Sequence, residues 1–505
     1  MSRKIGVILS YVLMLLEVVS TLLLTPFIIR TLGQAEFGVY KLSITINAYL
    51  LLLDLGVGNA ITRYVAKYRV DGDEEKQKQF LGVATVFYCI IAAVALVIGF
   101  VLIQLFPTVF AKGLSPSETA LGQKLLAITM VNSAFTLGTV PFANVLIAYE
   151  RFAASRGSSI IQIIFRMVFT FLAVSMNMGS VGIVTVNLIT TVVCRSFFVF
   201  YVTGKLKLIP KFKGIKAGFI KEIVVYSSLI LLQMVATQLN ASVDQVLIGS
   251  LVTSSAVILA VYGVGTQIVQ YFQSIGTAFT GVMMPGIVGM VERKASPKEL
   301  LNEMVRIGRI IFMVLMLIWS AFLINGREFV ILWAGAENSD AYIVALILML
   351  AYSLVLTESI GTQVLWALNQ HKEQSFLKIA IVLVNIILTV FLIKWQPLIG
   401  ATLGTFISLI AGDIIVMNII FIKKIKINLL TYYSGIFKGI LPSALLSILC
   451  GWLLSLVYSG GVAATGVNLL LMTAVYAAAM WLFGMNGYEK QLFGSLLRKI
   501  IRFKK

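Results

Sequence analysis

Long apolar runs recur along the whole chain, and short polar segments separate them. An α-helix needs about 20 apolar residues to cross the hydrocarbon core of a bilayer, so the runs predict about fourteen membrane-spanning helices. A membrane β-barrel would instead show alternating segments of about ten residues, and none occurs in the sequence. The predicted spans are 5–29, 39–61, 80–106, 120–149, 157–177, 181–203, 220–248, 257–290, 304–324, 341–368, 376–393, 398–422, 433–458 and 463–485.

The loops between these spans alternate in charge. Basic residues fill every second loop, from Arg3 and Lys4 at the start to the tail after Arg498. The opposite loops hold only Arg30, Lys112, Arg327 and Lys394. Because basic loops stay in the cytoplasm, we expect an inner-membrane protein with both termini cytoplasmic.

Composition agrees with lipid as the surrounding medium. Of the 505 residues, 59% are hydrophobic and only 12% are charged, whereas soluble proteins carry about 25% charged residues. The net charge of +19 is explained by attraction to anionic lipid head groups, so we expect membrane lipids as partners and no nucleic acid.

The chemistry of enzymes and metal sites finds little support in the sequence. The cysteines Cys89, Cys194 and Cys450 lie far apart in apolar runs, and the single histidine, His371, excludes a histidine-based metal site. No P-loop motif occurs, so the chain does not hydrolyse ATP through one. We expect a protein that is not an enzyme and has no cofactor or metal, with H⁺ or Na⁺ as a candidate coupling ion.

The sequence also repeats itself. Segments that begin at Asn144, Val181 and Gly38 resemble segments that begin at Gln363, Ile399 and Ala260, a shift of about 220 residues. Two lobes of about six helices each would have the same orientation in the membrane, which is typical of transporters that alternate between two states. The predicted divisions are an N-terminal lobe 1–210, a second lobe 211–428, and two extra helices with a basic tail in 429–505.

Several motifs resemble a known family. The run TPFIIRTLGQAEFGVYKL, followed by LLDLGVGNAITRYVAKYR, is similar to the opening of polysaccharide and oligosaccharide flippases. Asp244 in SVDQVLIGSL and Tyr262 in AVYGVG resemble the start of the second lobe in that family. The flippases belong to the multidrug/oligosaccharidyl-lipid/polysaccharide exporter superfamily.

The resemblance implies a function. A family member would turn undecaprenyl-pyrophosphate-linked oligosaccharides from the cytoplasmic to the outer leaflet by alternating access, for surface polysaccharide biosynthesis. Enzymes of polysaccharide biosynthesis are then candidate partners.

Ionisable residues inside the predicted spans are the candidates for function, because each costs about 2.5–3.5 kcal/mol on insertion scales. Guanidinium and ammonium groups bind phosphate oxygens, so the basic candidates would hold the pyrophosphate. These are Arg30, Lys41, Arg166 and Arg195. The repeat shift places Arg195 opposite Asp413, and the two residues are candidates for an ion pair. Each basic residue can alternatively extend to the interface.

Acidic residues at membrane depth exchange protons or bind Na⁺ in many transporters. The candidates for ion coupling are Glu17, Asp54, Asp244, Glu358 and Asp413. Pairing with a nearby basic residue is the alternative for each of them.

Three other functions remain open from the sequence. A cation-coupled multidrug exporter of the same superfamily would want a net acidic cavity, whereas the charges here have both signs. A flippase of the peptidoglycan lipid precursor would share the pyrophosphate anchor. A polytopic glycan polymerase or glycosyltransferase usually needs large outer loops, and the outer loops here are short.

Overall fold

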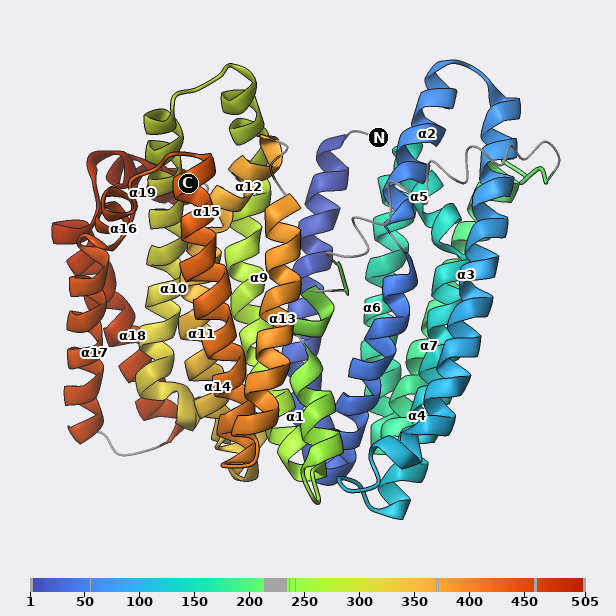
Figure 1. Cartoon of the computed structure of the whole chain (residues 1–505), viewed down its shortest axis with the longest axis horizontal. Helices are drawn as coiled ribbons and strands as arrows, with labels where there is room; N and C mark the ends of the chain where they lie inside the picture. Colours follow the sequence, from blue (N-terminus) through green and yellow to red (C-terminus); the bar gives the residue numbers. More distant parts are fainter. Residues whose placement is uncertain are drawn as a thin grey trace. The chain divides into compact units, whose positions relative to one another are not determined.

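The computed structural model describes a helical protein in two compact units, Met1–Ala260 and Val261–Lys505 (Figure 1). The described residues are 3–54, 56–212, 234–235, 237–240, 242–368, 370, 372–457 and 461–502, and no strand occurs among them. His371 and part of the predicted span 220–248 lie outside the described residues. The lobe boundaries expected near 210 and 428 stay a prediction.

The first unit consists of long helices that lie side by side. Their bounds are α1 (Arg3–Leu51), the short 3₁₀ helix η1 (Leu52–Asp54), α2 (Val57–Val70), α3 (Glu74–Val109), α4 (Pro116–Gly138), α5 (Val140–Ala148), α6 (Phe152–Ser175), α7 (Gly179–Phe200) and the π-helix η2 (Tyr201–Lys205). α1 packs against α4 and α6, α3 against α4, and α6 against α7. The apolar residues Ile61, Leu81 and Val145 of α2, α3 and α5 are fully buried in one core.

The second unit is built around α10 (Pro297–Ala334), which packs against α11, α16, α17 and α18. The other elements of this part are α9 (Ala256–Glu292), η3 (Ala336–Asn338), α11 (Ala341–Thr357), α12 (Ser359–Ala367), α13 (Lys372–Leu392), α14 (Pro397–Leu409), η4 (Ile410–Val416), α15 (Met417–Lys424), α16 (Leu429–Phe437), α17 (Ile440–Val457), α18 (Val462–Ala479), η5 (Met480–Gly484) and α19 (Gly487–Arg502). η4 and η5 are π-helices.

Ten helices in the described part of the chain are long and apolar enough to cross a membrane, or eleven if the bent pair α4 and α5 is one span. The protein is therefore a multi-pass, all-helical membrane protein. The predicted count of about fourteen is higher for three reasons. Helix α9, which holds the predicted span 257–290, is not among the helices counted. The first two predicted spans form one element that bends at Gly33, where φ is 74°, and the predicted span 220–248 is described only in part.

The helices confirm the internal repeat. α3, α4, α6 and α7 begin at residues 74, 116, 152 and 179, and α10, α11, α13 and α14 begin at 297, 341, 372 and 397. The breaks also correspond, since α4 and α5 are separated at Thr139 and α11 and α12 at Glu358. The spacing between counterparts stays between 218 and 225 residues, so the two halves share one helix order.

The C-terminal helices are fixed to the second unit by one arginine. Arg309 of α10 is 6% exposed and forms a two-pronged ion pair with Glu489 of α19, at 2.7 and 3.2 Å. Its guanidinium also donates to the carbonyl oxygens of Gly435, Lys438 and Gly484. A planar guanidinium with five donors suits this role, because one side chain satisfies several helix ends together.

Candidate functional site

The second unit contains a buried carboxylate at a helix break. Glu358 occupies the turn that separates α11 from α12 and is 2% exposed. Its Oε1 atom accepts hydrogen bonds from the amide of Asn418 on α15, at 2.9 Å, and from the hydroxyl of Tyr433 on α16. The Asn418 amide also donates to the Tyr433 hydroxyl at 2.5 Å. Three elements that lie apart in the sequence thus meet at one carboxylate.

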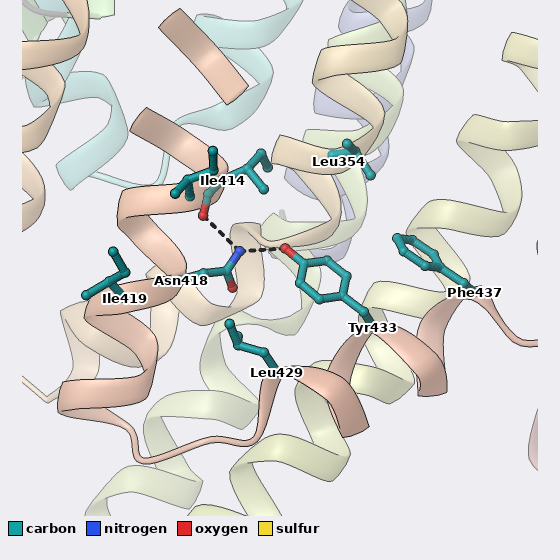
Figure 2. A pocket seen from close by; sticks show the side chains of 8 residues that line it. Leu354, Ile414, Asn418, Ile419, Leu429, Tyr433 and Phe437 are labelled. Carbon is teal, nitrogen blue, oxygen red and sulfur yellow. Dashed lines mark hydrogen bonds between the residues drawn. The ribbon is translucent and has the colours of Figure 1, made fainter. Parts of the chain in front are cut away.

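Asn418 and Tyr433 also line an apolar groove. Figure 2 shows their side chains pointing toward each other from α15 and α16, with the Ile414 carbonyl as a further acceptor for the amide. The groove has a volume of about 630 Å³, and its other lining residues are Leu354, Ile414, Ile415, Ile419, Leu429 and Phe437. The polar cluster therefore lies beneath an apolar surface of the second unit.

A second buried carboxylate lies at the same depth. Asp413 belongs to the π-helix η4, is 5% exposed and pairs with Lys378 of α13 at 2.6 Å. Single-turn π-helices inside α-helices occur often at functional sites. At a rise of about 1.5 Å per residue, Glu358 and Asp413 each lie about 25 Å along their helices from Ala341 and Pro397. The local pair with Lys378 neutralises Asp413 without Arg195, the partner that the repeat had indicated.

In the first unit, a charged pair lies at another helix break. The second half of α1 ends in η1, and Gly56 with φ 68° separates η1 from α2. At this break the Tyr88 hydroxyl of α3 donates to the Asp54 carboxylate at 2.6 Å. Arg195 of α7 lies close enough to Asp54 for an electrostatic interaction, and its guanidinium is 5.8 Å from the centre of the Phe198 ring. At this helix break, the carboxylate of Asp54 therefore interacts with the guanidinium of Arg195.

Two other basic candidates lie at a similar depth on α1 and α6. Lys41 and Arg166 are half-buried on α1 and α6, which pack against each other. Lys41 lies about 12 Å from the bend at Gly33, and Arg166 about 14 Å from the end of α6 at Ser175. These two helix ends lie on the same side, because Glu36 accepts a hydrogen bond from the Ser180 backbone N–H just beyond α6. Arg166 also interacts electrostatically with Tyr40, the residue before Lys41.

The remaining candidates are placed differently. Arg30 and Glu17 have exposed side chains on α1, and the hydroxyl of Thr21 donates to the Glu17 backbone rather than to its carboxylate. Asp244 is buried in the first unit, next to Gln245, which is bonded to Thr45 of α1 at 2.5 Å. The structure thus brings together Asp54 with Arg195 and Glu358 with Asp413, and it places Lys41 and Arg166 at a similar depth on two packed helices.

Four residues of these clusters did not stand out in the sequence: Tyr88, Lys378, Asn418 and Tyr433. Lys378 counted only as one of the basic residues near a loop. The other three are neutral polar residues in apolar helices, where such residues are common. No local pattern marks them, because their partners come from distant helices.

The family is decided by comparison with known proteins. The family model described as "Polysaccharide biosynthesis protein" matches residues 6–291. The chain belongs to this family.

Solved structures show that this family member shares its fold with membrane transporters. The lipid II flippase MurJ in an inward closed conformation is 15% identical, with a TM-score of 0.73 over 98% of this chain and 100% of that one. An inward-facing multidrug resistance MATE family transporter of the MOP superfamily is 14% identical, with a TM-score of 0.63 over 81% of this chain and 95% of that one. The MATE multidrug transporter DinF-BH in complex with R6G is 18% identical, with a TM-score of 0.58 over 84% and 95%. No curated protein matches significantly.

The polysaccharide family indicated by the sequence motifs is confirmed, and so is the all-helical polytopic fold. At these identities the structural likeness speaks for the fold alone. The substrate and the direction of movement are inferred from the chain's own residues.

Proposed function

We propose that this protein moves undecaprenyl-pyrophosphate-linked oligosaccharides from the cytoplasmic to the outer leaflet, by alternating access. The observation that carries the proposal is the pair Lys41 and Arg166, two half-buried basic residues on packed membrane-spanning helices of a polysaccharide biosynthesis protein. Each costs about 2.5–3.5 kcal/mol to place in a membrane, so an anionic ligand offers a reason for both.

A pyrophosphate suits these side chains. Its oxygens accept two parallel hydrogen bonds from one guanidinium, while an ammonium serves as a compact second charge. Arg166 and Lys41 come from two packed helices at a similar depth, so both would attract an anionic head group at that level of the membrane. Arg195 would then serve an earlier position of the substrate, because it lies about 24 Å along α7 from the start of that helix.

Rival functions make different demands on these residues. A multidrug exporter for organic cations would need carboxylates at the positions where the first unit has Lys41 and Arg166. A flippase of the peptidoglycan precursor would use the same pyrophosphate contacts, so it differs from the proposal only in the sugar. A glycan polymerase would form glycosidic bonds to an acceptor glycan. Movement of the substrate in an assay without an acceptor does not require such bonds, so it would distinguish transport from polymerisation.

The test is transbilayer movement of a fluorescent polyprenyl-pyrophosphate oligosaccharide in vesicles that contain the purified full-length protein. We expect movement that depends on the protein and falls about tenfold or more in Arg166→Ala, because a hydrogen bond to a charged group contributes about 1.5–3 kcal/mol. The rate is measured as the fraction of probe that becomes protected from an impermeant quencher.

Arg151→Ala is the matched control, because Arg151 is an exposed arginine just before the start of the same helix. It should retain the wild-type rate. Equal movement in Arg166→Ala and wild type would contradict the assigned role of Arg166. An immobile probe, together with uptake of an organic cation such as ethidium, would favour the drug exporter.

A further inference from the structure

The charged layer of the second unit contains more negative than positive charge. Glu358 and Asp413 are both at least nine-tenths buried and close enough to interact electrostatically, and one ammonium, Lys378, pairs with Asp413. Two other ion pairs of this unit are balanced, since Arg309 pairs with Glu489 and Lys424 with Glu373. With both carboxylates ionised, the cluster carries one uncompensated negative charge.

In the described part of the chain, hydrogen bonds reach only one oxygen of each carboxylate. Glu358 Oε1 accepts from two donors, Asn418 and Tyr433, and Asp413 Oδ1 accepts from an ammonium. Hydrogen-bond donors stabilise a charged carboxylate while burial opposes the charge, so a cluster with both carboxylates ionised needs a counter-charge. A buried uncompensated charge is costly, so a bound cation would remove the imbalance.

Three oxygen atoms in the cluster remain available for a ligand. Glu358 Oε2, Asp413 Oδ2 and Asn418 Oδ1 are buried and have no hydrogen-bond partner among the described residues. Buried polar atoms almost always have a partner, so three such oxygens in one cluster require an explanation. Carboxylate and amide oxygens are the ligands that hard cations prefer.

The first unit provides an internal comparison. Asp54, like Glu358, lies at a helix break and accepts a hydrogen bond from a tyrosine hydroxyl. Its charge is offset by Arg195, so one carboxylate faces one guanidinium. The repeat shift makes Asp413 the counterpart of Arg195. A positive residue of the first unit is thus replaced by a negative one in the second, so only the cluster of the second unit has an excess of negative charge.

We propose that Glu358, Asp413 and Asn418 bind one monovalent alkali cation, with Tyr433 closing the site from α16. A single positive charge would neutralise the cluster, and a divalent ion would overcompensate it. Tyr433 belongs to the helices that follow the repeat, so those helices complete the site. Gly435, two residues later, is held by Arg309, which fixes the position of α16. Binding does not depend on the proposed substrate, whereas a role of the cation in driving export rests on the proposed function.

Thermal unfolding of the purified full-length protein in detergent tests the site without any transport. Choline chloride is replaced by NaCl at constant ionic strength, and in a parallel series by KCl. A ligand that binds only the folded state raises the Tm as its concentration increases. We expect NaCl or KCl to raise the Tm of the wild type, and Glu358→Gln and Asp413→Asn each to weaken the apparent affinity about tenfold or more.

Asp54→Asn is the matched comparison, because it removes a carboxylate from the corresponding tyrosine bond in the first unit. It should keep the cation-dependent rise in Tm. A rise that is absent in the wild type, or that persists unchanged in both Glu358→Gln and Asp413→Asn, would overturn the proposal. Stabilisation by acid alone, with no response to either alkali cation, would also overturn it.

Direct binding of ²²Na⁺ to the wild type keeps the test decisive if the variants do not fold. Saturable binding that unlabelled NaCl displaces supports the site, and its absence together with no response to KCl contradicts it. Cation binding without movement of the lipid-linked probe would leave the site intact and remove the proposed function. Movement of the probe without cation binding would do the reverse.

Discussion

At the scale of single residues, Arg309 has the largest expected effect on stability. It pairs with Glu489, which is 1% exposed, and donates to three backbone carbonyls at the ends of α16 and η5. Arg309→Ala would leave a buried carboxylate without its partner, a change that typically costs about 3–5 kcal/mol. We expect a correspondingly lower free energy of unfolding, measured by denaturant titration of the purified protein in detergent.

Arg306 is the matched control for Arg309, since it lies one turn earlier on the same helix. It pairs with Glu303 at 3.2 Å and stacks on Tyr488, but its side chain is 44% exposed. Exposed ion pairs and cation–π contacts contribute about 1 kcal/mol or less each, so Arg306→Ala should be much milder. Equal losses in the two variants would show that the buried ion pair is not what fixes the C-terminal helices.

The sequence could predict which charged residues matter, but not their partners. Glu358 and Asp413 were found because a charge inside an apolar run is expensive. Their partners Tyr433 and Lys378 come from other helices, and the repeat even indicated Arg195 as the partner of Asp413. Hydropathy records how apolar a segment is, and it contains no information about which helix faces meet.

At the scale of helices, close packing depends on glycine at specific positions. A Cβ atom on Gly38 of α1 would lie 1.9 Å from the Ala256 carbonyl oxygen, which is backbone and has little freedom to move. Overpacking of this kind costs about 1–3 kcal/mol. Gly38→Ala should therefore lower the stability measured by thermal unfolding in detergent, despite the better helix propensity of alanine.

Gly157 in α6 offers the opposite case, because nothing lies within 4 Å of the position its Cβ would take. Alanine is favoured over glycine inside a helix by roughly 1 kcal/mol. Gly157→Ala should be neutral or slightly stabilising. If both glycine variants behaved alike, helix propensity rather than the contact with Ala256 would explain the result for Gly38.

Helix positions were largely predictable, and helix irregularities were not. The predicted spans 341–368 and 398–422 correspond to α11 with α12 and to α14 with η4 and α15. The break at Glu358 and the π-helix at Asp413 change the hydrogen bonding of only a few residues. The break and the π-helix leave the apolar pattern intact, so hydropathy does not predict them.

At the scale of the whole molecule, the basic segments of the first unit gather at one of its ends. In the first unit Lys211 pairs with Glu75 at 2.7 Å, and Arg69 donates to the Ala148 carbonyl, so three basic segments meet at one end. Gly113 and Ser255 are bonded at the opposite end. Basic loops alternate with weakly charged loops along the sequence, and within this unit the two kinds of loop therefore lie at opposite ends.

This separation leads to a prediction about orientation. Asp71 and Ser117 are exposed at opposite ends of the first unit, in the segments before α3 and after it. In a variant without Cys89, Cys194 and Cys450, an impermeant maleimide should label Ser117→Cys on intact cells. It should label Asp71→Cys only after permeabilisation, because basic segments stay in the cytoplasm.

The orientation decides how the charged layers relate to the substrate. With the basic ends inside, Asp54 and Arg195 lie toward the cytoplasm and Lys41 and Arg166 toward the outside. An anionic head group would then meet the mixed pair first and the purely basic pair last, which favours movement outward. Labelling of Asp71→Cys on intact cells, with Ser117→Cys protected, would reverse this order and contradict an export direction based on these residues.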